Sequence, residues 1–213
     1  TGNNVTNTAS AGDLHSLYLK SDGSLWAMGN NGTAQLGDGT DMDRSSPVQI
    51  ESSGVSSVAA GGGHSLYLKS DGSLWAMGWN GSGQLGIGTT DQQKSPVQVL
   101  DALGGNPVTN VVSVASGANH ALYVKNDGSL WAVGRNDQGQ LGDGTGMKRL
   151  SPVQVLDALG GNPITNVVSV AAGWHHSLYL KSDGSLWAMG NNYYGQLGIG
   201  TTDQQKSPVQ VLD

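Results

Sequence analysis

Hydrophobic and polar residues alternate through four copies of one short segment, which reads HSLYLKSDGSLWAMG in the first copy. The copies occupy residues 15–29, 64–78, 120–134 and 176–190. Because successive side chains of a strand point to opposite faces, this alternation predicts two strands in each copy. The Asp-Gly between them predicts a tight hairpin turn of type I′, which needs positive φ at both central residues. No helical periodicity competes with this pattern.

Two further strands are predicted, one on each side of every hairpin. A valine-containing stretch that ends in small residues precedes the hairpin, at 5–12, 55–61, 111–117 and 167–173, and Ser-Pro-Val-Gln follows it, at 46–49, 95–98, 151–154 and 207–210. Small residues suit the crowded axis of a radial fold, and proline suits an outer strand because it cannot donate to a ladder. The sequence therefore predicts an all-β fold, a β-propeller of four-stranded antiparallel blades with four blades in the chain.

The repeats divide the chain into four similar units. Trp26, Trp75, Trp131 and Trp187 are separated by 49, 56 and 56 residues, which is the range expected for a repeat architecture. The longer period comes from a DALGGNP connector at 101–107 and 157–163, where insertions are tolerated. We expect one domain over 1–213, with repeats at 5–50, 55–100, 111–156 and 167–212.

The repeated residues also carry a family resemblance. The pattern V-x-x-V-A-x-G-x-x-H-x-L-x-L-x-x-D-G-x-L-x-x-x-G, followed by G-Q-L-G-x-G and then P-V, resembles the regulator of chromosome condensation repeat family over essentially the whole chain. The resemblance implies a β-propeller, usually of seven blades. Family members act as exchange factors for small GTPases or as chromatin-bound proteins, and a related bacterial secreted propeller inhibits β-lactamases. This chain departs from the family in having four near-identical repeats, and no residues match an exchange-factor loop.

Charge and composition narrow the possible partners. The net charge of −6 disfavours nucleic acid, whose binding relies on Lys and Arg against phosphate. The absence of cysteine excludes disulfides and thiolate metal sites. No apolar run approaches the roughly 20 residues that span a bilayer, so no membrane partner is expected. The chain begins at Thr1, where a signal peptide could have been removed, and we favour an exported or cell-surface bacterial protein.

Residues that recur in every repeat are interpreted as structural. The histidines His15, His64, His120 and His176 occupy one framework position, so they would lie a blade apart, each bonded to a neighbouring backbone group. The tryptophans are expected to pack blade against blade and the Asp-Gly aspartates to form turns. The 38–43 segment resembles a calcium loop but lacks its terminal glutamate. We therefore expect no catalytic residue, no metal and no cofactor.

Residues that differ between repeats are the candidates for function. The variable positions fall in the loops between the first and second strands and between the third and fourth, which emerge on the same face of an up-and-down blade. They include Trp79, Arg135, Trp174, His175, Tyr193 and Tyr194. Such residues anchor binding surfaces, whereas random drift in loops would not favour Trp and Tyr.

The sequence thus predicts a non-enzymatic scaffold that presents a variable loop face to a protein or glycan ligand. Two alternatives stay open. One is an amplified or engineered repeat whose main property is self-assembly. The other is a propeller that acts like a small-GTPase exchange factor or like an enzyme inhibitor.

Four blades of a family that usually closes with seven would leave apolar end faces around Trp26 and Trp187. Three solutions exist: a closed four-bladed ring, a fragment of a longer array, or two copies joined around a twofold axis. We favour the third, a homodimer that forms an eight-bladed ring, because its two junctions are equivalent.

Overall fold

The computed structural model describes residues 7–102, 105–158 and 161–212. Within these residues, sixteen strands form four antiparallel four-stranded sheets, and each sheet is one blade whose strands follow one another in chain order. The first blade comprises β1 (Thr8–Ala11), β2 (His15–Leu19), β3 (Leu25–Gly29) and β4 (Arg44–Glu51), and the second comprises β5 (Val55–Ala60), β6 (His64–Lys69), β7 (Leu74–Gly78) and β8 (Gln93–Gln98). The third comprises β9 (Val111–Ser116), β10 (His120–Lys125), β11 (Leu130–Gly134) and β12 (Arg149–Gln154), and the fourth comprises β13 (Val167–Ala172), β14 (His176–Lys181), β15 (Leu186–Gly190) and β16 (Gln205–Gln210).

The predicted hairpins are present, but the predicted turn type is wrong. In the first hairpin only Gly23 has positive φ, at +80°, whereas a type I′ turn also requires it at Asp22. The amide of Gly23 donates to the carbonyl of Lys20, and the amide of Lys20 donates to the carbonyl of Ser24. The loop is therefore a type I turn followed by a left-handed glycine, the common three-residue hairpin. The Asp22 carboxylate accepts bonds from the amide and hydroxyl of Ser24, which holds the turn.

Apolar cores form between blades. Leu17, Leu19 and Leu25 of blade 1 bury Tyr67 and Met77 of blade 2, and two further cores repeat this arrangement along the chain. Extensive contacts also join β1 to β5, β5 to β9 and β9 to β13. The first strand of each blade therefore lies nearest the axis, as its small residues predicted.

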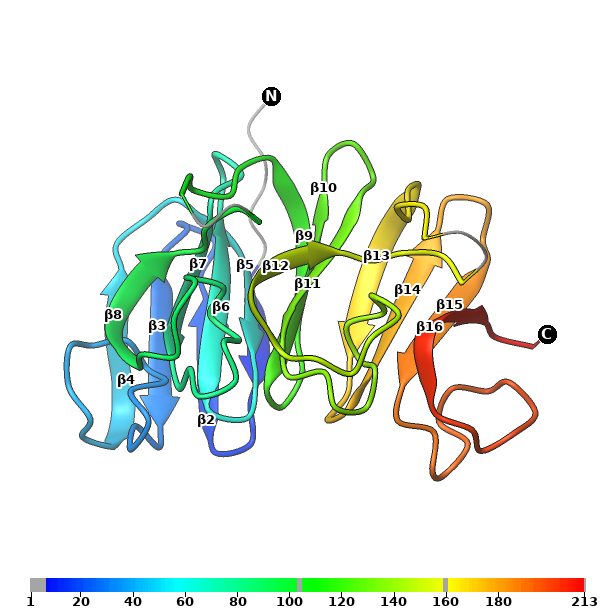
Figure 1. Cartoon of the computed structure of the whole chain (residues 1–213). Helices are drawn as coiled ribbons and strands as arrows, with labels where there is room; N and C mark the ends of the chain where they lie inside the picture. The colour runs from blue at the N-terminus through cyan, green and yellow to red at the C-terminus, as the bar shows by residue number, and fades with distance from the viewer. Residues whose placement is uncertain (1–6, 103–104, 159–160, 213) are drawn as a thin grey trace.

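The four blades form an open arc. Figure 1 shows blade 1, in blue, and blade 4, from yellow to red, at opposite ends. Within the described residues, no extensive contact joins the strands of blade 1 to those of blade 4, so the chain does not close as a four-bladed ring. The end face of blade 4 is correspondingly open: Leu180 and Leu186 are 36% and 39% exposed, whereas their counterparts in blade 2 are 5% and 0% exposed.

Two sequence predictions reach beyond the described residues. The predicted first strand began at residue 5, as did the first predicted repeat, and residues 5 and 6 lie outside the described part. Residues 103–104 and 159–160 of the two connectors, and residue 213 at the end of the predicted domain, also lie outside it.

Candidate functional site

The variable loops share one face of the arc. They are the loop between the first and second strand of each blade, and the longer loop between the third and fourth strand. In Figure 1 the long loops gather along the lower edge, opposite the hairpin turns. We call this surface the loop face.

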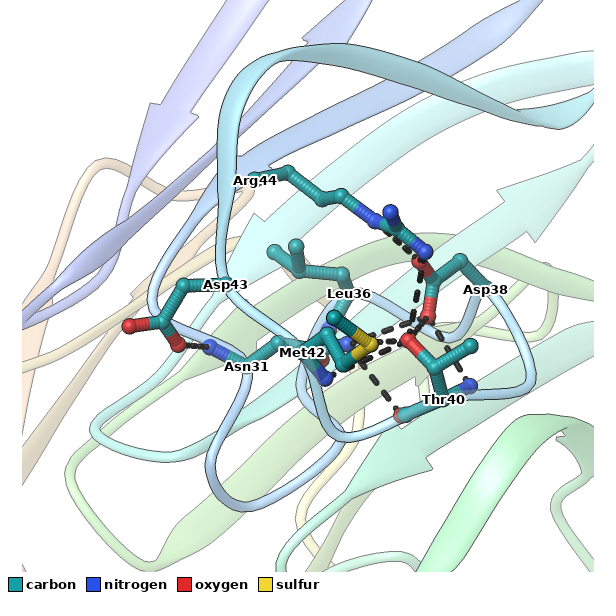
Figure 2. Close-up of polar contacts among 7 residues, drawn as sticks. All are labelled: Asn31, Leu36, Asp38, Thr40, Met42, Asp43 and Arg44. Atoms are coloured by element: carbon teal, nitrogen blue, oxygen red, sulfur yellow. Dashed lines mark hydrogen bonds and ion pairs between the residues drawn. The ribbon is translucent and has the colours of Figure 1, made fainter.

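A buried asparagine holds each long loop from beneath. In blade 1 the side-chain amide of Asn31 donates to Asp38 Oδ1 and to the carbonyl of Thr40, and its Oδ1 accepts from the amide of Leu36 (Figure 2). Asn136 bonds Asp143 and the carbonyl of Thr145 in the same way, whereas Asn80 and Asn192 each donate to two loop carbonyls; in all three the side-chain oxygen accepts from a loop amide, and all four asparagines are essentially inaccessible to solvent. The loop path is therefore set by one buried position in each blade.

The long loops alternate between two types along the chain. In blade 1, Arg44 pairs with Asp38 at 2.6 Å (Figure 2), and Arg149 pairs with Asp143 at 2.7 Å in blade 3. Burial alone would raise the pKa of Asp38, but hydrogen bonds from Thr40 and Arg44 outweigh it and the pKa lies below its ordinary value. Blades 2 and 4 have isoleucine at the aspartate position, so the loop type repeats every two blades.

The framework histidines link successive blades, through serine side chains and not through the backbone groups that the sequence suggested. His15 Nε2 lies 2.8 Å from Ser65 Oγ of blade 2, and Ser65 Oγ donates to the carbonyl of Gln35 at 2.7 Å. His120 pairs with Ser177 of blade 4 at 2.9 Å. Burial lowers the pKa of His15 to about 4, so the ring is neutral at pH 7.

The junction between blades 2 and 3 keeps the histidine bond by a different route. Blade 3 has Ala121 where blades 2 and 4 have serine, and its preceding strand has Ser116 where blade 2 has Ala60. Ser116 Oγ lies 2.8 Å from His64 Nε2 and replaces the missing hydroxyl. The serine lost at position 121 is thus replaced by a serine gained at position 116, and the histidine keeps its hydrogen bond to the next blade.

Five of the six predicted binding residues lie on neighbouring loops of blades 3 and 4. Trp174 stacks on His175 with ring centroids 5.5 Å apart, and Tyr193 meets Tyr194 edge-on at 4.9 Å. Trp174, Tyr193 and Tyr194 are 67%, 73% and 86% exposed. The amide of Asn191 donates to the carbonyl of His175, so the two loops of blade 4 meet beside these pairs.

Blade 3 supplies a charged border to this aromatic group. Arg135 pairs with Asp137 through two bonds of 2.6 and 2.7 Å. The sequence signal for this contact is a pair of opposite charges two positions apart in one loop, and it was not part of the prediction. Burial lowers the pKa of His175. The positive charge of Arg135 lowers this pKa further and the negative charge of Asp137 raises it, because both charges lie near the imidazole. Gln138 accepts a 2.9 Å bond from Asn191 and joins the loops of the two blades.

Trp79, the sixth predicted residue, stands on the long loop of blade 2, next to Gly63 and Gly81, and is 43% exposed. It belongs to the same face but to a different blade. Nearer the axis, the ends of the innermost strands surround a shallow depression of about 230 Å³, with Asp13 and Trp174 among its lining residues. The sequence pattern does not indicate this depression, because its lining is mainly Gly and Ala.

The described residues offer no obvious metal centre, since no three His, Cys, Asp or Glu side chains are grouped to hold an ion. Nor does any helix in that part of the chain have the length and apolarity of a membrane span. The exposed aromatic side chains on its loops make the loop face a candidate site for binding.

A family model described as RCC1-like domain matches residues 1–213. The chain belongs to the RCC1-like domain family. Protein RCC2 homolog of Xenopus laevis is 45% identical over 105 residues, which cover 48% of this chain and 20% of that protein. Human Protein RCC2 is 42% identical over 111 residues, which cover 52% of this chain and 20% of that protein. The RCC1-like chain thus matches about a fifth of the length of these relatives.

Solved structures agree with this assignment. Human WBSCR16 superposes with a TM-score of 0.84 and 26% identity, over 97% of this chain and 52% of that one. Prp20p of Saccharomyces cerevisiae, described with its binding to Gsp1p and histones, superposes with a TM-score of 0.80 and 25% identity, over 100% of this chain and 52% of that one. These relatives are eukaryotic, so they lend no support to a bacterial source, which stays a prediction.

Proposed function

We propose that the RCC1-like arc is a non-enzymatic scaffold that binds a protein through its loop face. The observation that carries the proposal is the pair of exposed aromatic contacts, Trp174 on His175 and Tyr193 against Tyr194, on two adjoining loops of one blade. Exposed aromatic groups of this size are characteristic of binding surfaces. Arg135 borders this group, and Trp79 offers a second anchor on blade 2.

The family supports a protein ligand over a glycan. Prp20p is described as binding Gsp1p and histones, and a yeast RCC1 is described in a complex with Kap60. A role in regulating a small GTPase is the second candidate, and Prp20p is the relative that favours it. The net charge of −6 remains the argument against nucleic acid, and that expectation stays a prediction.

Binding measurements with substituted chains test this proposal. The probes are a small GTPase of the Gsp1p class, purified histones and a glycan array. We expect Trp174→Ala and Tyr194→Ala each to weaken protein binding by roughly 1–3 kcal/mol, about 5- to 150-fold. Val112→Ala is the control, because Val112 is 56% exposed on β9 and away from the loops. Failure of both protein probes, or binding that survives both substitutions, would overturn the assignment, and glycan binding alone would identify the other ligand class.

The arc also has two open ends, and we propose that a second copy of the chain covers them in an eight-bladed ring with a twofold axis. Two observations support this. The arc superposes on human WBSCR16 at a TM-score of 0.84 and covers 52% of that chain, so the arrangement of its four blades matches part of a larger structure. Its end face carries apolar side chains, Leu180 and Leu186, that are buried at equivalent positions inside the arc. This is also the form that the self-assembly alternative takes.

A further inference from the structure

The junction between blades 1 and 2 consists of a socket and a knob. The socket is Leu17, Leu19 and Leu25, which are fully buried and which enclose Tyr67 from the next blade. Met77 lies beside Tyr67 and packs over Gly37 of blade 1. A Cβ atom added to Gly37 would lie 3.4 Å from the Cβ of Met77.

A polar latch closes the same junction. It joins His15 to Ser65 and Ser65 to the carbonyl of Gln35. The knob is therefore Ser65, Tyr67 and Met77. Ser65 lies opposite Met77 in the hairpin formed by β6 and β7, and Tyr67 lies opposite Trp75.

Blade 4 has the same socket without a knob. Leu178, Leu180 and Leu186 line a shallow apolar depression on its open end face, together with Val170. His176 is half-buried there, whereas the histidines of the other three blades are at most 3% exposed. Among the described residues, no serine bonds His176 in the way that Ser65 bonds His15.

Blade 1 has the same knob without a socket. Ser16, Tyr18 and Met28 hold the positions of Ser65, Tyr67 and Met77, and the pairing of β2 with β3 repeats that of β6 with β7. Tyr18 and Met28 are half-buried, whereas Tyr67 and Met77 are fully buried. The free knob and the free socket lie at opposite ends of the arc (Figure 1), so the described arc does not bring them together.

We infer that the socket of blade 4 receives the Ser16, Tyr18 and Met28 knob of a second copy, in the register of the junction between blades 1 and 2. Residues 15–29, 64–78 and 176–190 are identical in sequence. Pairing 176–190 with 15–29 of another copy therefore reproduces, residue for residue, the pairing of 15–29 with 64–78. This inference rests on the proposed eight-bladed ring and specifies its contacts.

Two neighbouring features fit the same register. The long loops alternate in type along the chain, and an isoleucine-type blade 4 followed by an aspartate-type blade 1 continues that alternation. In addition, the amides of Gly39, Gly88 and Gly144 each donate to a carbonyl of the next blade's outer strand, at 2.9–3.0 Å. The corresponding donor at the open end is Gly200, which would reach the outer strand of the second copy's blade 1.

Engineered cysteines test the register directly, because the chain contains none. The test pair is Gly198→Cys with Met28→Cys, and the control pair is Gly37→Cys with Met77→Cys. The 3.4 Å separation at the control pair lies near the Cβ–Cβ distance of a disulfide, about 3.5–4.5 Å. Gly198 and Gly37 both have positive φ, at +64° and +73°, so the two pairs carry similar backbone strain.

After oxidation and non-reducing electrophoresis, we expect the control pair to give a cross-linked monomer and the test pair a covalent dimer. A cross-linked monomer from the test pair would mean that the chain closes on itself. No cross-link from the test pair, while the control pair reacts, would overturn the register.

Light scattering separates this inference from the loop-face proposal. We expect twice the 21.8 kDa mass for the unmodified chain and the monomer mass for Leu180→Asp, with probe binding at the loop face retained in both. A monomeric unmodified chain that still binds its probe would overturn the ring and the junction together but leave the scaffold role. A dimer that Leu180→Asp does not dissociate would place the contact on another face.

Discussion

Ser65→Ala tests how much the latch between blades 1 and 2 contributes to stability. The Ser65 hydroxyl is fully buried, contacts His15 Nε2 at 2.8 Å and donates to the carbonyl of Gln35 at 2.7 Å. Alanine removes both bonds and leaves the histidine nitrogen and the carbonyl buried. At about 1 kcal/mol for each neutral hydrogen bond, and with two buried groups left unsatisfied, we expect a loss of about 2 kcal/mol in the free energy of unfolding.

The junction between blades 2 and 3 supplies the rescue. There Ser116 bonds His64 from the position that Ala60 holds in blade 2. Ala60→Ser in the Ser65→Ala background should restore the histidine bond but not the bond to Gln35. We therefore expect the double variant to regain about 1 kcal/mol. Ala60→Ser alone should not stabilise the chain, because His15 Nε2 already has a partner.

The assay is urea unfolding of all four chains, followed by tryptophan fluorescence, with Ser182→Ala as an exposed-serine control. The double-mutant cycle should give a coupling energy of about 1 kcal/mol between positions 60 and 65. A loss below about 0.5 kcal/mol for Ser65→Ala would refute the latch. A coupling energy near zero would refute the claim that the two serine positions are interchangeable.

Three further predictions concern buried polar groups. Burial lowers the pKa of His15 to about 4, below the 6.5 of the unfolded chain. The neutral ring therefore contributes roughly 3 kcal/mol to the free energy of unfolding above pH 6.5, and this contribution declines as the pH falls towards 4. Urea unfolding at pH 7.5 and 4.5 measures the decline, and an equally steep decline in His15→Gln would contradict the assignment to His15. Asn80→Ala should lower the free energy of unfolding by about 2–3 kcal/mol, because three hydrogen bonds to the loop are lost. Thermal unfolding should show a lower melting temperature. An unchanged melting temperature would mean that the loop keeps its path without the asparagine. Tyr67→Phe should cost about 1 kcal/mol, because the Tyr67 hydroxyl donates to Glu51 at 2.6 Å. Tyr179→Phe should be neutral or stabilising, because the buried hydroxyl of Tyr179 has no hydrogen-bond partner among the described residues. Equal losses of the two variants in urea unfolding would contradict this.

The sequence predicted the blades because strand alternation and turn residues are local signals. The turn type was wrong because Asp-Gly is compatible with two loop lengths, and only the bond between Lys20 and Ser24 shows that the loop has three residues. The partner of His15 was also missed. Ser65 lies 50 positions away on another blade, and neither residue alone indicates which face of the strand meets which neighbour.

The candidate site was partly predictable for a similar reason. Comparing repeats selected Trp174, Tyr193 and Tyr194, and the structure places them on adjoining loops of one blade. The comparison of repeats could not show that Asp137 forms an ion pair with Arg135, or that Trp79 lies on a different blade from the other aromatic residues. Those relations depend on loop paths, and buried asparagines such as Asn136 set those paths.

The asparagine beneath each long loop has a consequence for how such proteins acquire new specificities. Asn80 contacts backbone atoms of its loop at Thr89, Asp91 and Leu85, so its bonds do not depend on which side chains the loop carries outward. Positions such as 79, 193 and 194 can therefore change in combination while the loop keeps its course. Selection for a new ligand can act on these surface codons at little cost to folding, and a randomised library at the same positions would start from an intact framework.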